Sequence, residues 1–209
     1  MNVVVGQSGG PTAVINASLA GVYQAAVKAG AEKVYGMRNG IQGFLSENLV
    51  DLKTVLDSEA KVELLKRTPA TFLGSCRYKL KSAEDNGADY EKIFEILKKY
   101  EIDCFFYIGG NDSMDTICKL AAYGKKIGSA IRFVGVPKTI DNDLMVTDHT
   151  PGYGSAAKFV ATTMKELICD ARIYQLNSVL IVEVMGRNAG WLTAASALAK
   201  GEDCEGVDM

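Results

Sequence analysis

Four short segments of this 209-residue chain combine glycine or polar side chains with groups that can bind phosphate or move protons, and each follows an apolar run. The segment richest in such groups is Pro137–Asp143, which carries Lys138, Asp141 and Asp143. A carboxylate beside an acceptor hydroxyl can take its proton, and a lysine can neutralise charge on a transferring phosphoryl group. The segment therefore indicates acid–base and anion chemistry, although a solvated polar loop is the plainer alternative.

Two glycine-rich segments can bring the main chain close to a phosphate. Gly6–Thr12 carries three glycines, and Gly109–Ser113 carries two glycines followed by Asn111 and Asp112. Main-chain N–H groups in such turns bind anions, and amide and carboxylate oxygens can hold a divalent cation. The first segment is neither a Walker A loop nor G-x-G-x-x-G, so an ordinary strand-to-helix turn stays open for it. A turn that caps the next helix is the alternative for the second.

Arg187 lies in the fourth segment, Met185–Arg187, and a further candidate, Arg77, lies outside the four segments in Gly74–Arg77. An arginine fork matches the geometry of a phosphate. Either one taken alone is equally typical of a surface charge, so these two gain meaning only from their neighbours.

Short runs rich in Val, Ile and Phe alternate with longer segments of helical period, which is typical of a parallel sheet covered by helices. The expected strands are Val3–Val5, Lys33–Met37, Cys104–Ile108, Ile131–Val136 and Val179–Val184. The expected helices are Asn16–Lys28, Asp51–Lys66, Tyr90–Tyr100, Met114–Ala122, Ala156–Cys169 and Trp191–Ala199. Ligands of such sheets bind at the carboxyl ends of the strands, where the candidate segments lie.

Composition excludes several classes of function. Lys and Arg number 23 against 25 for Asp and Glu, so no charge excess points to nucleic acid or a membrane surface. No apolar run approaches the roughly 20 residues that span a bilayer, and the N-terminus lacks the features of a signal peptide. The five cysteines form neither a C-x-x-C pair nor a disulfide framework, which favours reduced thiols in a cytoplasmic protein. A single histidine, His149, leaves little material for a histidine-built zinc site or a Ser-His-Asp triad.

Taken in order, these segments resemble the phosphofructokinase family, and the resemblance runs from Val3 to the end of the chain. Its specific motifs are G-G-[DN]-x-S at Gly109–Ser113, P-x-T-I-D-N-D at Pro137–Asp143 and M-G-R at Met185–Arg187. The resemblance implies an α/β fold with a donor-binding domain over residues 1–150 and the start of a domain that binds fructose 6-phosphate over residues 151–209. It also implies magnesium-dependent phosphoryl transfer to the 1-hydroxyl of that sugar.

The resemblance also assigns roles to individual residues. Asp141 would be the general base, and the other catalytic residues would be Arg187, Lys138 and Asp112. The donor would contact Gly9, Gly10, Arg77, Gly110, Asp112, Ser113 and Lys138. The sugar would contact Thr139, Ile140, Asp141, Asp143, Met185, Gly186 and Arg187. The magnesium ligands would be Asn111 and Asp112, with Asn111 in a place where many members have aspartate.

Two positions indicate that the donor is diphosphate. Asp112 and Lys138 stand where ATP-using members carry glycine, as they do in diphosphate-using members. An aspartate adds bulk and like charge where an α-phosphate would lie, and a lysine can hold the phosphate leaving group. The alternatives are an ATP-dependent member with unusual loops and a non-catalytic subunit that binds sugar phosphate. A Rossmann dehydrogenase is disfavoured because its fingerprint is missing.

The chain ends where the family would begin another strand, so we expect it to be part of a longer enzyme and to be inactive alone. The full-length protein is expected to be a cytoplasmic homo-oligomer, either dimer or tetramer, without nucleic-acid or membrane partners.

Overall fold

The computed structural model describes residues 1–173 and 175–207. The chain divides into two compact units, Met1–Lys138 and Thr139–Met209. The division falls inside the P-x-T-I-D-N-D motif, and the expected domain boundary at residue 150 lies inside the second unit.

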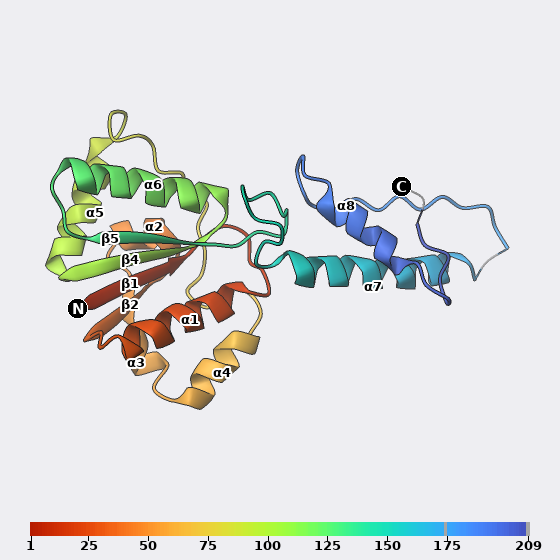
Figure 1. Cartoon of the computed structure of the whole chain (residues 1–209), viewed down its shortest axis with the longest axis horizontal. Helices are drawn as coiled ribbons and strands as arrows, with labels where there is room; N and C mark the ends of the chain where they lie inside the picture. The colour runs from red at the N-terminus through yellow and green to blue at the C-terminus, as the bar shows by residue number, and fades with distance from the viewer. Residues whose placement is uncertain (174, 208–209) are drawn as a thin grey trace. The chain divides into compact units, whose positions relative to one another are not determined.

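The first unit contains a sheet and most of the helices (Figure 1). Its strands are β1 (Asn2–Gln7), β2 (Lys33–Met37), β3 (Leu49–Asp51), β4 (Ile102–Gly109) and β5 (Arg132–Pro137). Its helices are α1 (Ile15–Lys28), α2 (Gly40–Leu45), α3 (Leu52–Val55), α4 (Glu59–Arg67), α5 (Gly87–Lys99) and α6 (Asn111–Lys126). The described part of the second unit contains α7 (Tyr153–Ala171), α8 (Trp191–Ala195) and a 3₁₀ helix, η1 (Ser196–Ala199).

The five strands form one sheet in the order β3-β2-β1-β4-β5. Strands β2, β1, β4 and β5 are parallel, and β3 runs antiparallel to β2. Gln7 at the end of β1 pairs with Ile108 of β4, and Gly109 pairs with Pro137 of β5. The loops after β1, β4 and β5 therefore leave the same edge of the sheet, and the predicted parallel, helix-covered sheet is confirmed.

The core lies on both faces of the sheet because successive side chains of a strand point to opposite faces. Val3 and Val5 of β1 pack in a cluster with residues of α1, α3 and α4. Val4 between them packs in a second cluster with residues of α2, α5 and α6. Figure 1 shows α5 and α6 on one side of the sheet and α1 on the other. This double cover explains why β1 and β4 read as continuous apolar runs.

The prediction of one helix over Asp51–Lys66 was wrong. The segment begins at the end of β3 and then forms α3 and α4, with a break between them. The Asp51 side chain accepts a hydrogen bond of 3.0 Å from the Lys53 N–H, and the Ser58 hydroxyl accepts one of 3.4 Å from the Lys61 N–H. Two separate N-caps thus start two short helices where the apolar period suggested one.

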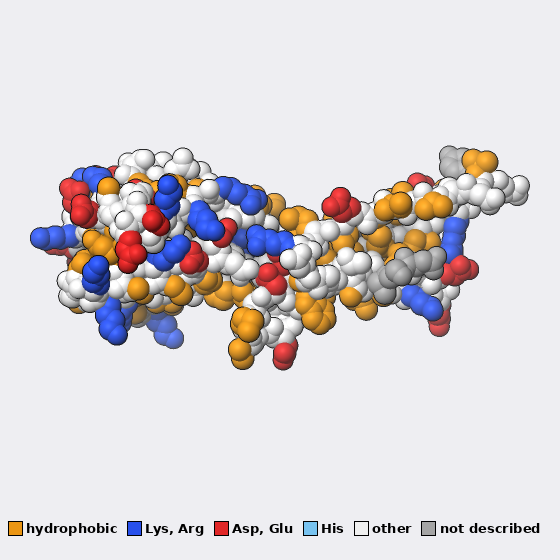
Figure 2. Space-filling model, turned by 90° about the horizontal axis from the view of Figure 1, so that it is seen from above, with side chains coloured by type: hydrophobic (Ala, Val, Ile, Leu, Met, Phe, Trp, Pro, Cys, Tyr) orange, Lys and Arg blue, Asp and Glu red, His pale blue; other side chains and the backbone are white. Residues whose placement is uncertain are grey.

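The prediction of a buried strand over Val179–Val184 was also wrong. The segment has no regular structure, and Val179 and Ile181 are 89% and 88% exposed. A strand needs a neighbouring strand to hydrogen-bond with, and the described residues of the second unit form no strand. Apolar side chains are visible at the surface of this unit in Figure 2.

Helix α7, with 19 residues, is the longest described helix. Neither it nor any other helix among the described residues is long and apolar enough to cross a bilayer. Val160 and Met164 of α7 pack with Leu192 and Ala199 in a small separate core.

Candidate active site

The loop after β1 turns at Gly9, whose φ of +75° lies in the left-handed region that favours glycine. The Ser8 N–H donates a 2.9 Å hydrogen bond to the Ile108 carbonyl, and the Gly9 carbonyl accepts one of 2.6 Å from the Ser75 hydroxyl. A Cβ atom added at Gly9 would lie 3.3 Å from the Lys138 Nζ. Glycine here allows the loop to approach a lysine closely.

Lys138, at the end of the first unit, is only 3% exposed. Its main-chain N–H donates a 2.9 Å hydrogen bond to the Gly109 carbonyl, and its ammonium group donates to the Gly10 carbonyl. A Cβ atom added at Gly110 would lie 3.7 Å from the Lys138 carbonyl oxygen. The Lys138 ammonium group therefore lies against the loop that carries Gly10, where an anion bound to that loop could meet its charge.

Helix α6 begins earlier than predicted, at Asn111 instead of Met114. Asn111 and Asp112 are exposed in its first turn, whereas Ser113 is 3% exposed and its hydroxyl pairs with the Ser8 hydroxyl. A Cβ atom at Gly109 would lie 1.9 Å from the Ser113 Oγ, so only glycine permits this packing. The partial positive charge of the helix N-terminus adds to the attraction for an anion.

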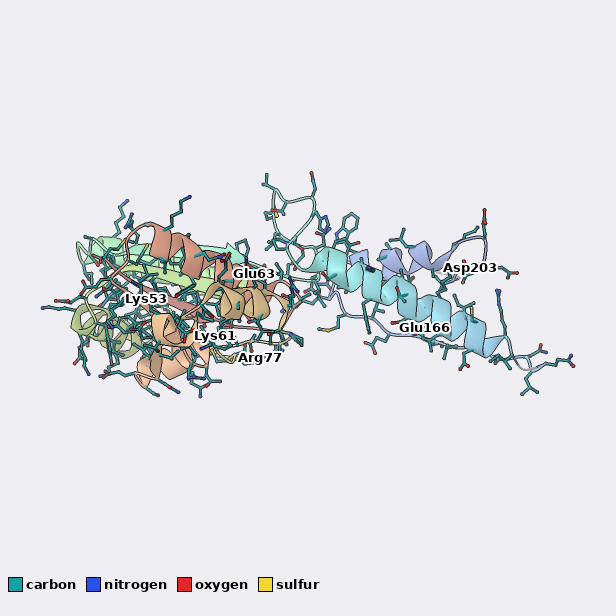
Figure 3. The ribbon with its side chains drawn as sticks, turned by 90° about the horizontal axis from the view of Figure 1, so that it is seen from below. Lys53, Lys61, Glu63, Arg77, Glu166 and Asp203 are labelled. Carbon is teal, nitrogen blue, oxygen red and sulfur yellow. The ribbon has the colours of Figure 1, made fainter. Side chains whose placement is uncertain are left out.

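Arg77 is exposed on the segment between α4 and α5 that has no helix or strand (Figure 3). Its neighbour Cys76 connects this segment to the first loop, because the Cys76 carbonyl accepts a 3.5 Å hydrogen bond from the Gly9 N–H. The structure therefore ties the main chain next to Arg77 to the loop that carries Gly9 and Gly10.

Two fully buried amides that the sequence analysis missed hold the same segment. The Gln7 Oε1 accepts a 2.9 Å hydrogen bond from the Leu73 N–H, and the Asn16 Oδ1 accepts one of 2.9 Å from the Phe72 N–H. The Gln7 Nε2 donates to the Asn16 Oδ1 at 2.9 Å, and the Asn16 Nδ2 donates to the Thr68 carbonyl at 2.9 Å. The only signal in the sequence was an amide at the end of an apolar run, Gln7 two residues after Val5.

The predicted sugar-contacting residues all lie in the second unit. The Thr139 hydroxyl accepts a 3.1 Å hydrogen bond from the Asp141 N–H, and the Thr139 carbonyl accepts one of 2.8 Å from the Thr150 hydroxyl. Ile140 packs against the small core of α7, and Asp143 is half-buried. Ile140 therefore anchors the loop between the polar residues Thr139 and Asp141.

Asn142, between the two aspartates, was also missed by the sequence analysis. It adopts the left-handed conformation with φ of 56° and is 7% exposed. Its Oδ1 accepts a 2.8 Å hydrogen bond from the Thr150 N–H, and its Nδ2 donates at 3.2 Å to the Asp148 carbonyl. These bonds close the loop and hold Asp141 and Asp143 in place on either side.

Asp141 and Arg187 are brought together, with 3.9 Å between Oδ2 and Nε. The Asp141 side chain is 14% exposed and that of Arg187 is 67% exposed. Gly186 and Arg187 have φ of 145° and 51°, so the chain turns sharply at M-G-R. Met185, the first residue of the motif, is 70% exposed. M-G-R does not follow a strand, yet its arginine still meets the predicted base.

The family model that describes phosphofructokinase matches residues 2–205. The chain belongs to the phosphofructokinase family. A relative named pyrophosphate–fructose 6-phosphate 1-phosphotransferase, from Xanthomonas campestris pv. campestris, is 49% identical over 200 residues, covering 95% of this chain and 47% of the relative. Another with the same name, from Methylococcus capsulatus, is 45% identical over 205 residues, covering 96% of this chain and 48% of that protein.

The fold agrees with solved phosphofructokinase structures. The structure of pyrophosphate-dependent phosphofructokinase from Nitrosospira multiformis matches with a TM-score of 0.88 and 44% identity, covering 98% of this chain and 51% of that one. The chain thus spans about half the length of the relatives that it matches.

The oxygen ligands that this phosphofructokinase chain offers fit a magnesium ion whose remaining ligands come from a bound phosphate compound. The described residues contain no group of three or more His, Cys, Asp or Glu side chains that could hold a metal on their own. Mg²⁺ in phosphoryl-transfer sites is usually bound by one or two carboxylates plus substrate phosphates. Asp112 and the neighbouring Asn111 offer oxygen ligands of this kind in the first turn of α6.

Proposed function

We propose that the protein to which this chain contributes transfers a phosphoryl group from diphosphate to the 1-hydroxyl of fructose 6-phosphate. The products are fructose 1,6-bisphosphate and phosphate. The observation that carries the proposal is the buried Lys138 ammonium group, which lies against Gly10 in the loop expected to receive the donor. The names of the relatives that are 45–49% identical support the same reaction.

The reaction is an in-line displacement at the terminal phosphorus of diphosphate. The 1-hydroxyl oxygen of the sugar forms the new P–O bond, and the bond from that phosphorus to the bridging oxygen breaks. The hydroxyl proton passes to the Asp141 carboxylate, and inorganic phosphate leaves with the bridging oxygen. The reverse reaction uses the same groups, because both directions pass through the same transition state. It is accessible because the free energy released by diphosphate hydrolysis is close to that required for sugar phosphorylation. The reaction could therefore serve glycolysis or gluconeogenesis.

The cations of the site have separate roles in this proposal. Lys138 neutralises the phosphate leaving group, and Arg77 contacts the donor from the neighbouring loop. Arg187 lies near the proposed base and would stabilise charge on the transferring group. Magnesium, held by Asp112 with Asn111 beside it, would neutralise the diphosphate oxygens when bound.

Asp112 also supports diphosphate over ATP as the donor. It is an exposed carboxylate in the first turn of α6, the end of the helix that favours a bound phosphate. An extra α-phosphate and nucleoside close to this carboxylate would meet like charge and bulk. The buried lysine and this aspartate thus favour the smaller donor from two sides.

We place the protein in the cytoplasm and expect the full-length form to be a homo-oligomer. All five cysteines are free, which suits a reducing compartment. The exposed apolar side chains of the second unit, among them Val179 and Ile181, suit a surface that further protein covers.

The test is a phosphoryl-transfer assay on the 209-residue chain and on a form extended through its natural reading frame. Each receives fructose 6-phosphate and Mg²⁺ with either diphosphate or ATP, and fructose 1,6-bisphosphate is measured. Diphosphate-dependent product from the extended form supports the proposal. Product with ATP alone would favour an ATP-dependent kinase, and sugar-phosphate binding without product would favour a non-catalytic subunit.

A further inference from the structure

Tyr107, near the carboxyl end of β4, is a buried tyrosine to which the proposed reaction assigns no role. It is 2% exposed. A Cβ atom added at Gly40 would lie 2.7 Å from the Tyr107 hydroxyl oxygen, and one added at Gly6 would lie 3.1 Å from its ring. Glycines on two other elements therefore leave the space that this one side chain fills.

The hydroxyl group of Tyr107 is where several segments of the donor side meet. It accepts a 3.2 Å hydrogen bond from the Ile41 N–H at the start of α2. The Cys76 Sγ lies 3.7 Å from it, and the Ser8 side chain is close enough to interact with it. Ser8 in turn pairs with the Ser113 hydroxyl at the start of α6. The phenol oxygen thus contacts helix α2 and the Thr68–Arg77 segment, and it interacts with Ser8 of the loop after β1, which in turn pairs with α6.

The partners of this hydroxyl adjoin proposed donor-binding residues. Ser8 directly precedes Gly9 and Gly10. Cys76 directly precedes Arg77. Moving either partner would move groups that the donor phosphates are expected to contact.

Burial also keeps this hydroxyl in a single protonation state. Desolvation by burial raises the pKa of Tyr107 above its usual value. The phenol therefore keeps its proton across the physiological range and remains both a donor and an acceptor of hydrogen bonds.

We propose that Tyr107 is a positioning residue of the donor side, which through Ser8 and Cys76 holds the Gly9–Gly10 loop and Arg77 in the arrangement that receives diphosphate. This inference rests on the proposed function. A tyrosine that served only the core would affect the free energy of unfolding and leave the KM for diphosphate unchanged.

The test compares Tyr107→Phe with Tyr23→Phe in the full-length protein. The Tyr23 hydroxyl also donates a buried hydrogen bond, 2.9 Å to the Leu56 carbonyl, but no donor loop contributes to it. Both variants lose one hydroxyl and keep the ring. We expect Tyr107→Phe to raise the KM for diphosphate about three- to tenfold, the effect of one lost hydrogen bond, with the KM for fructose 6-phosphate unchanged. Tyr23→Phe should leave both KM values at the wild-type level.

Ser8→Ala removes the neighbouring hydroxyl and decides the matter if Tyr107→Phe does not fold. It should raise the KM for diphosphate alone, and the double variant should be no worse than the poorer single variant, because both cut one network. Two outcomes would overturn this inference and leave the proposed function standing, provided that the wild type is active. In one, the folded variants keep the wild-type KM for diphosphate; in the other, the KM values for diphosphate and fructose 6-phosphate rise equally. A wild type that uses neither diphosphate nor ATP would overturn the proposed function, and the inference with it.

Discussion

The carboxylate of Asp141 lies 3.9 Å from the guanidinium of Arg187, across 46 residues of sequence (187 − 141 = 46). Asp141 is largely buried and Arg187 is largely exposed, so the arginine can turn toward a ligand while the carboxylate is held by its loop. The pair thus brings P-x-T-I-D-N-D and M-G-R together in space, whereas the sequence analysis gave only their order along the chain.

Asp141→Asn should abolish most of the turnover, because an amide keeps the shape of the side chain but cannot accept the hydroxyl proton. We expect kcat to fall by about 10²–10⁴-fold, with binding of fructose 6-phosphate retained. Steady-state kinetics and calorimetric titration of the sugar measure the two quantities. Asp148→Asn, at an exposed position of the same loop, is the control. A kcat within about twofold of wild type, far short of that loss, would remove Asp141 from the role of base.

Asp112→Gly combined with Lys138→Gly should shift donor use toward ATP. The double variant removes the bulk and charge that oppose a nucleotide, and it also removes the cation that holds a phosphate leaving group. The ratio of kcat/KM for ATP to that for diphosphate should therefore rise. Asp115→Gly with Lys126→Gly changes equivalent charges further along α6 and should leave that ratio unchanged. No movement in the ratio for the first pair would contradict the account of donor choice.

Asn142→Ala and Asn142→Gly separate the two contributions of this residue. Both remove the side-chain bonds to Thr150 and Asp148, but glycine tolerates the φ of 56° that alanine resists. We expect alanine to lower the free energy of unfolding by about 1–2 kcal/mol more than glycine does. Denaturant unfolding measures this. Equal losses would mean that backbone strain at this position is negligible.

Val146→Gly should stabilise the loop that follows the aspartates. Val146 is fully exposed and has φ of 56°, which is strained for a β-branched residue. Relief of that strain exceeds the entropy cost of glycine, so we expect a gain of about 0.5–1 kcal/mol. Met145→Gly, at an exposed neighbour without positive φ, should instead cost stability. Thermal unfolding of the two variants tests the sign, and a lower melting temperature for Val146→Gly would refute it.

The sequence by itself determined the family, the central sheet and the segments that carry chemistry. Runs such as Cys104–Ile108 could be read locally, because a strand covered on both faces must be apolar throughout. The three motifs could be read as well, because their residue types and spacing are specific. Lys138 beside Gly10 follows from them once parallel strands are known to end at a common edge.

Only the tertiary structure decided the features that depend on partners distant in sequence. Val179–Val184 has the composition of a strand, but whether a strand forms depends on a hydrogen-bonding neighbour, and composition does not carry that information. Gln7 and Tyr107 lie outside the three motifs, and the P-x-T-I-D-N-D motif assigns Asn142 no role, so the importance of all three comes from hydrogen bonds that exist only after folding. Local sequence sets the tendency of each segment, whereas the pairing of buried polar groups is a property of the packed whole.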